Sequence, residues 1–376
     1  MNQSSRIFGA AAMLLLLALA LSSCGAAAVS QDWPDLAVDN GLVYVVSGAP
    51  QAVYLLDAET GVQKSSFSPA LQSAGARYWS PVTAAGELAF VGFGVQETKP
   101  PTYGLYAFDP LTGQERWHVE ATGFVLGAPA YADGVVYFGD SKGKVYAVDA
   151  EKRNVKPGWP FEAGGAVWGS PLVEDGKVYV ASLDHHLFCL DAQTGAVLWD
   201  YEAQGALAAR PTLNAATGIL YIGDFVGKMN AVHADSGQAV EGFAFQAKNW
   251  IWSEALLAGD RLYVTSLDGN LYALDLATGA VLPSYPFDGG DVLRAAPVQS
   301  GDTVFVASKE GKVTAVDGKT GVQLWQWPSG LSTTQILTTP VVVDGTLYVL
   351  QASGQMVALE AETGVQNWSF TLTASQ

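Results

Sequence analysis

The sequence predicts an all-β fold, an eight-bladed β-propeller whose blades are four-stranded antiparallel sheets. Two observations predict it. An element of the approximate form Leu/Val-Tyr-Ala/Leu-Leu/Val-Asp recurs eight times along the chain. Each repeat also holds four short β runs separated by turn-forming pairs such as Asp-Gly and Thr-Gly, in which glycine supplies a positive φ. A four-stranded unit of about 42 residues is typical of a propeller blade, and such blades close into one ring.

The repeats keep a regular register. The element ends at Asp57, Asp109, Asp149, Asp191, His233, Asp275, Asp317 and Glu360. The successive spacings are 52, 40, 42, 42, 42, 42 and 43 residues, and an insertion at 93–103, predicted as a loop, explains the long first interval. In the sixth unit the four strands are predicted at 255–257, 262–266, 271–275 and 281–285. Residues 33–376 are therefore predicted as a single propeller domain.

The composition is that of a folded, acidic protein. Of the 376 residues, 49% are hydrophobic and 15% are charged, which is enough apolar material for a large core. Acidic residues outnumber basic residues 36 to 19, for a net charge of −17. Proteins that bind nucleic acids carry a basic surface to neutralise phosphates, so the charge balance argues against a nucleic acid as partner.

The N-terminus has the features of a processing segment. Arg6 precedes an apolar run at 7–21, which is too short for a membrane-spanning helix and has the order of a signal peptide. The run ends in a Leu-Ser-Ser-Cys tetrapeptide at 21–24, which resembles a bacterial lipobox. The resemblance implies cleavage before Cys24 and acylation of its thiol. An ordinary secretory signal that contains a cysteine is the alternative.

Residues 1–23 are thus predicted as a lipoprotein signal peptide and residues 24–32 as a lipidated tether. Gly25, not aspartate, follows the lipidated cysteine, a pattern that resembles lipoproteins sorted to the outer membrane. We therefore predict the periplasmic face of the outer membrane in a two-membrane bacterium, and otherwise the extracellular face of the plasma membrane. Cys189 is the other cysteine, and alone it cannot form an intramolecular disulfide. It lies in the strand-like run 186–190, so it is predicted as a small core residue, with a nucleophile as the less favoured alternative.

The turn before the last strand of a unit carries the motif Asp-x-x-Thr-Gly-x-x-x-Trp. Its tryptophans are Trp117, Trp199, Trp325 and Trp368. The motif resembles the tryptophan-docking repeat of pyrroloquinoline-quinone (PQQ) propellers, and the resemblance implies that each indole docks between adjacent blades. Ser65, Glu241 and Pro283 take the tryptophan position in the first, fifth and sixth units, and in the third unit Trp159 is displaced by two residues.

The two faces of the predicted ring differ in sequence. If the strands of a blade alternate in direction from axis to rim, the formulaic Thr-Gly turns share one face and the variable blade-to-blade connectors share the other. We predict the connector face as a partner-binding face, because tryptophans, arginines and a lysine gather there in an acidic chain. Its candidate residues are Arg77, Trp79, Trp168, Arg210, Lys248, Trp252, Glu254, Arg294 and Gln335. Tryptophans that only pack between blades and arginines that pair with local carboxylates are the alternative.

Quinoprotein dehydrogenases supply an enzymatic alternative. Resemblance to them implies a PQQ stacked on a tryptophan and a Ca²⁺ held by Glu, Asn and Asp, and Trp252 and Glu254 match fragments of that site. The chain has no adjacent cysteines and no readable Asn and Asp ligands, so no cofactor is predicted, with PQQ and Ca²⁺ as the alternative. His185 and His186 stand where other units have a tight turn; a metal ion there is the less favoured interpretation.

A propeller preceded by a lipobox resembles the BamB-like lipoproteins of outer-membrane β-barrel assembly. The resemblance implies docking to an outer-membrane assembly protein through one face of the ring. The predicted function is a non-catalytic, lipid-anchored propeller scaffold for protein–protein interaction, monomeric and held at the membrane by its lipid alone. A PQQ-dependent quinoprotein dehydrogenase and a small-ligand-binding surface propeller are the alternatives.

Overall fold

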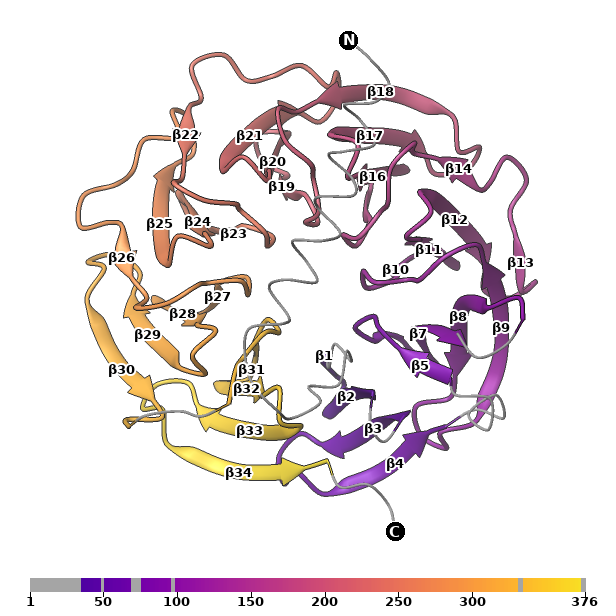
Figure 1. The fold of residues 1–376 in the computed structure, drawn as a ribbon, viewed down its shortest axis with the longest axis horizontal. Coiled ribbons are helices and arrows are strands. Elements are labelled where there is room, and N and C mark those ends of the chain that lie inside the picture. Colours follow the sequence, from indigo (N-terminus) through magenta and orange to yellow (C-terminus); the bar gives the residue numbers. More distant parts are fainter. Residues whose placement is uncertain (1–34, 49–50, 69–75, 96–98, 331–333, 373–376) are drawn as a thin grey trace. The chain divides into compact units, whose positions relative to one another are not determined.

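The computed structural model describes residues 35–48, 51–68, 76–95, 99–330 and 334–372. They belong to one compact unit, Asp32–Gln376, and form 34 strands in eight antiparallel sheets. Figure 1 shows the sheets placed around a central axis, so the predicted eight-bladed β-propeller is confirmed. Within the described ranges no helix has the length and apolarity to cross a membrane. The predicted signal peptide (1–23), the tether (24–32) and Cys24 lie outside the described residues.

Blades 1 to 4 follow one another along the chain. Blade 1 contains β1 (Asp35–Asp39), β2 (Leu42–Gly48), β3 (Gln51–Asp57) and β4 (Gln63–Phe67). Blade 2 contains β5 (Ala76–Tyr78), β6 (Thr83–Ala85), β7 (Leu88–Val95), β8 (Thr102–Phe108) and β9 (Glu115–Ala121), and both β5 and β6 pair with β7. Blade 3 contains β10 (Ala130–Ala132), β11 (Val135–Gly139), β12 (Lys144–Asp149), β13 (Asn154–Val155) and β14 (Phe161–Glu162), the last two on β12. Blade 4 contains β15 (Leu172–Glu174), β16 (Lys177–Ala181), β17 (His186–Asp191) and β18 (Val197–Glu202).

Blades 5 to 8 continue in the same order. Blade 5 contains β19 (Thr212–Asn214), β20 (Ile219–Gly223), β21 (Lys228–His233) and β22 (Phe245–Gln246). Blade 6 contains β23 (Leu256–Ala258), β24 (Arg261–Thr265), β25 (Asn270–Asp275) and β26 (Phe287–Asp288). Blade 7 contains β27 (Val298–Ser300), β28 (Thr303–Ala307), β29 (Val313–Asp317) and β30 (Gln323–Trp327). Blade 8 contains β31 (Val341–Val343), β32 (Thr346–Leu350), β33 (Gln355–Glu360) and β34 (Gln366–Thr371).

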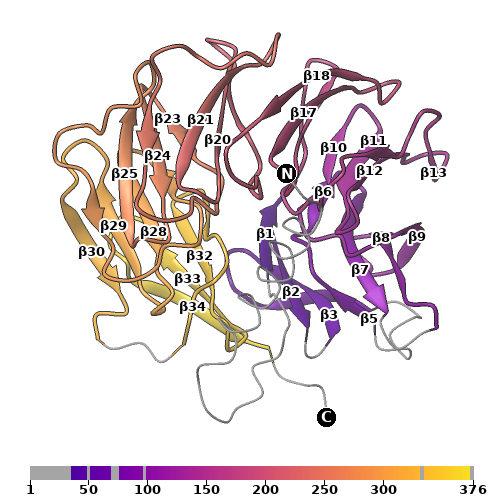
Figure 2. The same ribbon diagram turned by 45° about the horizontal axis from the view of Figure 1, so that its top comes forward.

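Each blade is built outward from the axis. Figure 1 shows the first strands, such as β1, β23 and β31, close to the centre and the last strands, such as β4, β30 and β34, at the outside. Figure 2 shows the blades side by side along the ring. Since neighbouring strands of a blade are antiparallel, the second-to-third turns and the connectors between blades lie on one face.

The fourth strand of blade 6 differs from its prediction. The first three predicted strands lie within one residue of β23, β24 and β25, but the fourth is β26 and not 281–285. Pro283 stands in the tryptophan position, and a proline has no N–H to donate to the ladder. Val281 therefore makes only an isolated bridge to Leu274, and pairing resumes beyond Pro286.

The insertion at 93–103 is partly strand and not wholly the predicted loop. β7 extends to Val95 and β8 begins at Thr102, and these two residues are partners in the register. The insertion therefore lengthens a hairpin of blade 2. The added part of β7 also supplies the edge on which β5 pairs, with Ala76 opposite Val95.

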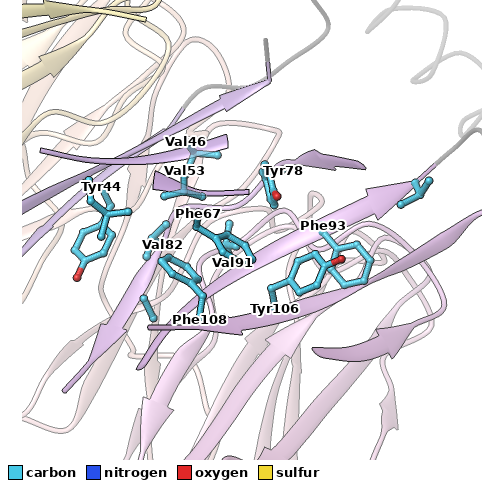
Figure 3. Packing of buried hydrophobic residues seen from close by; sticks show 13 residues of the cluster. Tyr44, Val46, Val53, Phe67, Tyr78, Val82, Val91, Phe93, Tyr106 and Phe108 are labelled. Atoms are coloured by element: carbon cyan, nitrogen blue, oxygen red, sulfur yellow. The ribbon is translucent and has the colours of Figure 1, made fainter. Parts of the chain in front are cut away.

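The core lies between neighbouring blades. The described residues form eight clusters of buried side chains, one at each junction of consecutive blades, including the junction of blade 8 with blade 1. Figure 3 shows the cluster between blades 1 and 2, where Phe67 stacks on Phe108 with 4.3 Å between ring centroids. Burying one apolar side chain of this size contributes about 1.5–3 kcal/mol, so these clusters hold the blades together.

A repeated hydrogen bond also joins the blades. A tyrosine of the second strand donates its hydroxyl to the carbonyl that follows the third strand of the next blade. The distances are 3.1 Å for Tyr137, 3.3 Å for Tyr179, 2.9 Å for Tyr221 and 2.7 Å for Tyr263, each with an acceptor 55 residues later. Tyr348 of blade 8 makes the equivalent bond to Ala58 O of blade 1 at 3.0 Å.

Outer-strand indoles dock on the following blade. In three blades the indole Nε1–H donates to a main-chain carbonyl of the next blade, and the ring covers a turn glycine whose Cβ, if present, would come within 2.6–2.7 Å of it. The pairs are Trp199 with Ala234 O (3.1 Å), Trp325 with Ala361 O (3.2 Å) and Trp368 with Ala58 O (3.1 Å). Trp117 is buried in the cluster between blades 2 and 3. Trp159 also lies near Gly195 of blade 4, 3.2 Å from where a Cβ would stand, but its buried Nε1–H makes no such hydrogen bond within the described ranges.

The ring closes without strand exchange. Blade 8 consists of residues 341–371 and blade 1 of residues 35–67, and in the described part of the chain no strand of one pairs with a strand of the other. Closure rests on a shared cluster that includes Leu36 and Met356, and on the two hydrogen bonds that Tyr348 and Trp368 donate to Ala58 O. Side chains therefore do at this junction what a covalent connector helps to do at the others.

Candidate functional site

The connectors are held in place by repeated backbone hydrogen bonds. A buried connector residue donates its N–H to a turn of the preceding blade, as Val167 does to Asp140 O at 3.0 Å and Ile251 to Asp224 O at 3.2 Å. In the other direction, a residue of the turn donates its N–H to the connector that precedes the first strand of its own blade. Phe225 N–H, for example, donates to Ala206 O at 3.0 Å. The side chains that follow each anchor thus project from fixed backbone.

Four aromatic side chains meet on the connector face; Trp168, Phe225, Trp250 and Trp252 are here called the aromatic cluster. Phe225 stacks with Trp250 at 4.6 Å and with Trp252 at 5.0 Å between ring centroids. Trp252 lies 6.0 Å from Trp168, which comes from the connector before β15. Phe225 is buried in the turn between β20 and β21, whereas the three tryptophans keep part of their surface exposed.

One arginine contacts this cluster, and a second binds a glutamate two residues after Trp252. The guanidinium carbon of Arg294 lies 4.5 Å from the ring centroid of Trp252, in cation–π geometry. Arg210 Nη1 donates to Glu254 Oε1 at 2.7 Å, and the two side chains are 39% and 34% exposed. Burial raises the pKa of Glu254 above its ordinary value, and Arg210 opposes that rise. The connector before β23 thus carries both an aromatic contact and a charged pair.

Asp35 adds a carboxyl group that acts on Arg294. It is the first residue of β1, and its own carboxyl accepts the Leu36 N–H at 2.8 Å. Burial raises the pKa of Asp35 to about 7, a rise that the Leu36 N–H and the positive charge of Arg294 oppose. Burial lowers the pKa of Arg294 to about 10, and Asp35 opposes that fall. The site therefore contains one acid that changes charge near neutral pH.

The structure brings five of the nine predicted face residues into contact. Trp168, Trp252 and Arg294 form one group, and Arg210 with Glu254 forms a second. Both groups include residues of the connector before β23, at positions 252 and 254. This placement agrees in part with the alternative that the arginines pair with local carboxylates, because Arg210 binds Glu254 and Arg294 interacts with Asp35.

The other four predicted residues lie elsewhere. Trp79 is buried and packs edge-on against Phe124 at 4.4 Å, and Arg77 is a partly buried residue of β5. Gln335 is exposed, and its carbonyl accepts the Ala352 N–H at 2.8 Å. Lys248 is exposed and lines a cleft of about 530 Å³ between the outer parts of blades 5 and 6, with Phe245 and Tyr272 among its walls.

The nine candidate residues leave out three residues of the site: Trp250, which lies two residues before Trp252 on the same connector, Phe225 and Asp35. Phe225 occupies a turn position where the other blades have Ser141, Leu183, Leu267, Lys309 and Ala352. Asp35 opens a first strand whose counterparts open with Leu172 and Thr212. Two features of the sequence could have indicated the latter two residues: Phe225 is an aromatic residue in a turn, and Asp35 is a carboxylate at the start of a half-buried strand.

The histidine pair and the free cysteine have local roles. His186 Nδ1 lies 3.2 Å from Asp200 Oδ2, and His185 takes a positive φ in the turn before β17. Cys189 is buried in β17, and burial raises the pKa of its thiol to about 11. Among the residues described, no group of three or more His, Cys, Asp or Glu side chains is arranged to hold a metal ion.

Comparison with known proteins relates the chain to one family. The family described as outer membrane protein assembly factor BamB matches residues 65–160, 104–249 and 231–376. The crystal structure of BamB from Moraxella catarrhalis is 20% identical and superimposes with a TM-score of 0.64, covering 79% of this chain and 90% of that one. The computationally designed Ika8 protein is 14% identical, with a TM-score of 0.69 over 91% of this chain and 97% of that one. At identities of 20% and 14%, the similarity to these two structures is evidence for the fold alone. No curated protein sequence matches the chain.

Proposed function

The chain belongs to the family of the outer membrane protein assembly factor BamB, and on that premise we propose that it is a lipid-anchored, non-catalytic scaffold that holds a protein partner on its connector face. Family membership supports a propeller scaffold in the cell envelope. The proposal adds the surface, the anchor and the absence of catalysis. The partner it names is a component of outer-membrane protein assembly.

The aromatic cluster with Arg294 is the observation that carries the proposal. Tryptophan and arginine dominate the binding energy of protein interfaces, especially where they sit on rigid backbone and are partly exposed. Trp168 and Trp252 meet both conditions, since the connectors that carry them are fixed by backbone hydrogen bonds. A partner that covers these indoles buries aromatic surface at a small cost in conformational entropy.

The charged groups beside the cluster define what the partner offers. Arg294 already lies on Trp252, and Arg210 already binds Glu254. A partner carboxylate can add to Arg294, or to the exposed part of Arg210 while Glu254 keeps its ion pair, so that no buried charge is left unpaired. We therefore propose a partner segment with an aromatic or aliphatic anchor next to an acidic residue.

Capture of the partner tests the surface. We expect Trp168→Ala to weaken crosslinking and co-purification from native membranes at least tenfold, as loss of an interface hot spot does. Leu111→Ala is the matched control, because Leu111 is 80% exposed on the opposite, Thr-Gly face. Equal losses from the two variants would refute the connector face as the docking surface.

A charge swap tests the polar part of the site. Reversal of Arg210 alone would place two carboxylates together, so the double variant Arg210→Glu with Glu254→Arg is the cleaner change. It keeps the ion pair while exchanging its ends. We expect the double variant to capture less of the partner protein while its melting temperature stays unchanged. Capture equal to that of the wild type would show that the partner does not bind this ion pair.

The absence of catalysis is part of the proposal and has its own support. A Ca²⁺-held quinone on Trp252 would need a free Glu254 carboxylate and an open indole face. Glu254 binds Arg210 at 2.7 Å, and Arg294 covers one face of Trp252, so these residues do not fit that group. We expect no alcohol-dependent dye reduction by the purified chain with added PQQ and Ca²⁺, and robust turnover would overturn the non-catalytic assignment.

Lipid anchoring at Cys24 is also proposed, on the lipobox resemblance of the sequence. Two or three acyl chains anchor a protein stably, because each buried methylene contributes about 0.8 kcal/mol. We expect the wild-type chain to incorporate labelled palmitate and Cys24→Ser to incorporate none. Equal incorporation by the two would contradict a lipid on this thiol.

A further inference from the structure

The first strand of the propeller starts on the connector face. β1 begins at Asp35, which pairs with Val46 of β2. It runs to Asp39 and turns back at 40–41, and such first-to-second turns lie on the face opposite the connectors, since the strands of a blade are antiparallel. Figure 1 shows β1 close to the centre of the ring. The N-terminal end of β1 therefore lies on the connector face, at its inner side.

The aromatic cluster and Arg294 lie close to the same end of β1. Trp168 and Trp252 belong to the connectors that lead into β15 of blade 4 and β23 of blade 6, and their rings are 6.0 Å apart although blade 5 separates these blades. Arg294, on the connector into β27 of blade 7, lies 4.5 Å from the Trp252 ring, and its charge acts on the carboxyl group of Asp35. Connectors of three blades thus meet beside the start of β1.

The sequence just before β1 carries side chains that suit this place. Residues 32–34 read Asp-Trp-Pro, so an aromatic side chain stands next to an acidic one, as we propose above for a partner segment. Two residues span at most about 7 Å, which keeps the backbone of Trp33 within that distance of Asp35. Pro34 fixes its own φ and restricts Trp33 to extended conformations, so the pair loses little conformational entropy on binding.

We propose that residues 32–34 occupy the connector face of their own chain, with the Trp33 indole on the aromatic cluster and the Asp32 carboxylate on Arg294. A guanidinium has five N–H donors, so Arg294 can serve Asp32 and Asp35 together. A partner protein then has to displace this segment, which makes the tether a regulator of access. The inference rests on the proposed docking surface and gives it an occupant from the chain itself. A second copy is a poorer source of the segment, because two chains of net charge −17 repel each other.

Attachment to β1 makes even a weak contact effective. A short connection gives the segment an effective concentration in the millimolar range. A segment that binds with a dissociation constant of about 0.1 mM as a free peptide is then bound in about 90% of the chains. Masking of that extent weakens the apparent affinity of a competing ligand about tenfold.

A peptide copy of the segment tests the inference without a partner protein. The probe is residues 29–34, Val-Ser-Gln-Asp-Trp-Pro, with a neutral BODIPY label and an amidated end. It is titrated by fluorescence anisotropy against the full chain, purified from membranes and reconstituted in phosphatidylcholine nanodiscs. We expect Trp33→Ala to bind the probe at least tenfold more tightly than the wild type, because the segment no longer competes. Gln31→Ala, just outside the segment, is the matched control and should bind within twofold of the wild type.

Variants of the face locate the bound probe. In the Trp33→Ala background we expect Trp168→Ala and Arg294→Gln each to bind the probe at least tenfold more weakly. Leu111→Ala, on the opposite face, should leave the affinity unchanged. The two face variants remove different contacts, so a variant that fails to fold leaves the other to make the test.

Three results would overturn the inference. Equal affinity of the wild type and Trp33→Ala for the probe, whether measurable or not, would show that the segment does not occupy the face. A loss in Leu111→Ala as large as in the face variants would indicate non-specific adsorption. A wild-type dimer in analytical ultracentrifugation that Trp33→Ala abolishes would assign the segment to a second copy. Capture of the partner protein is measured separately and can succeed where the probe fails, so failure of this inference is distinguishable from failure of the proposed function.

Discussion

Removal of the Trp368 indole is the sharpest perturbation of this ring, because the junction of blades 8 and 1 has no covalent connector. The indole donates Nε1–H to Ala58 O at 3.1 Å, lies 6.0 Å from the Tyr348 ring and covers Gly61. Trp368→Ala deletes all three contacts. Tyr348 keeps its own bond to Ala58, so the junction is weakened but not emptied.

The expected loss follows from those contacts. Large-to-alanine changes of aromatic core residues cost about 3–5 kcal/mol, and a hydrogen bond contributes about 1 kcal/mol of such a loss. Trp368 is only partly buried, so we expect about 3 kcal/mol. At about 1.4 kcal/mol per factor of ten, the open ring becomes roughly a hundredfold more populated.

Native-state hydrogen exchange measures that opening. Amides of β3 and β33, which flank the junction, should exchange roughly a hundredfold faster in Trp368→Ala when exchange follows the open population. Trp199→Ala is the matched control, since it loses an equivalent hydrogen bond of 3.1 Å at a junction where the chain itself connects the blades. We expect a similar loss of melting temperature there, with far less exchange in the neighbouring third strands. Equal exchange patterns in the two variants would refute the claim that side chains alone close the ring.

Three further predictions follow from single sites. Gly364→Ala should cost at least about 2 kcal/mol more than Gly345→Ala in urea unfolding, because both glycines have φ near +74° (73° and 75°) but only the first would place a Cβ 2.7 Å from an indole; equal costs would contradict the docking geometry. The pKa of Asp35, about 7 when folded against 3.8 ordinarily, means that the folded chain keeps a proton the unfolded chain loses, so its contribution to stability is full below pH 4 and falls as pH rises to about 7. Asp35→Asn removes this dependence, and its stability relative to the wild type should rise by up to about 4 kcal/mol between pH 4 and pH 8; a constant difference would contradict the assignment. Arg210→Gln should raise the pKa of Glu254 further and cost about 1 kcal/mol at neutral pH, a loss that a second change, Glu254→Gln, should restore.

The blade count and register could be predicted because they are local properties of the chain. The repeated element occurs eight times and six of its seven spacings lie between 40 and 43 residues, so an irregularity in one unit is corrected by its neighbours. Blade 6 shows where this averaging fails. Pro283 replaces the motif tryptophan, and the fourth strand moves beyond Pro286, which a register taken from the other units does not reveal.

The candidate site could be predicted only in part, because it depends on contacts between connectors. The sequence placed Trp168, Trp252 and Arg294 on one face, but not the contacts by which Trp252 meets Trp168, Arg294 and Phe225. The partner of Arg210 is 44 residues away, one blade on, where Glu254 replaces the proline of other connectors. Trp79 shows the opposite outcome, since a tryptophan on the same face is buried against Phe124. Which of two tryptophans is buried depends on the neighbouring connector, and composition does not record that.

Because side chains close the ring, every blade is a complete sequence module. Each blade is one uninterrupted stretch of sequence, so none is shared between the two ends of the chain. A gene that starts at any connector would encode the same eight sheets, and a duplicated or deleted repeat would add or remove a whole blade without dividing another. A transplanted blade must then match its neighbours in the docking tryptophan, the tyrosine hydrogen bond and the apolar side chains of the shared clusters.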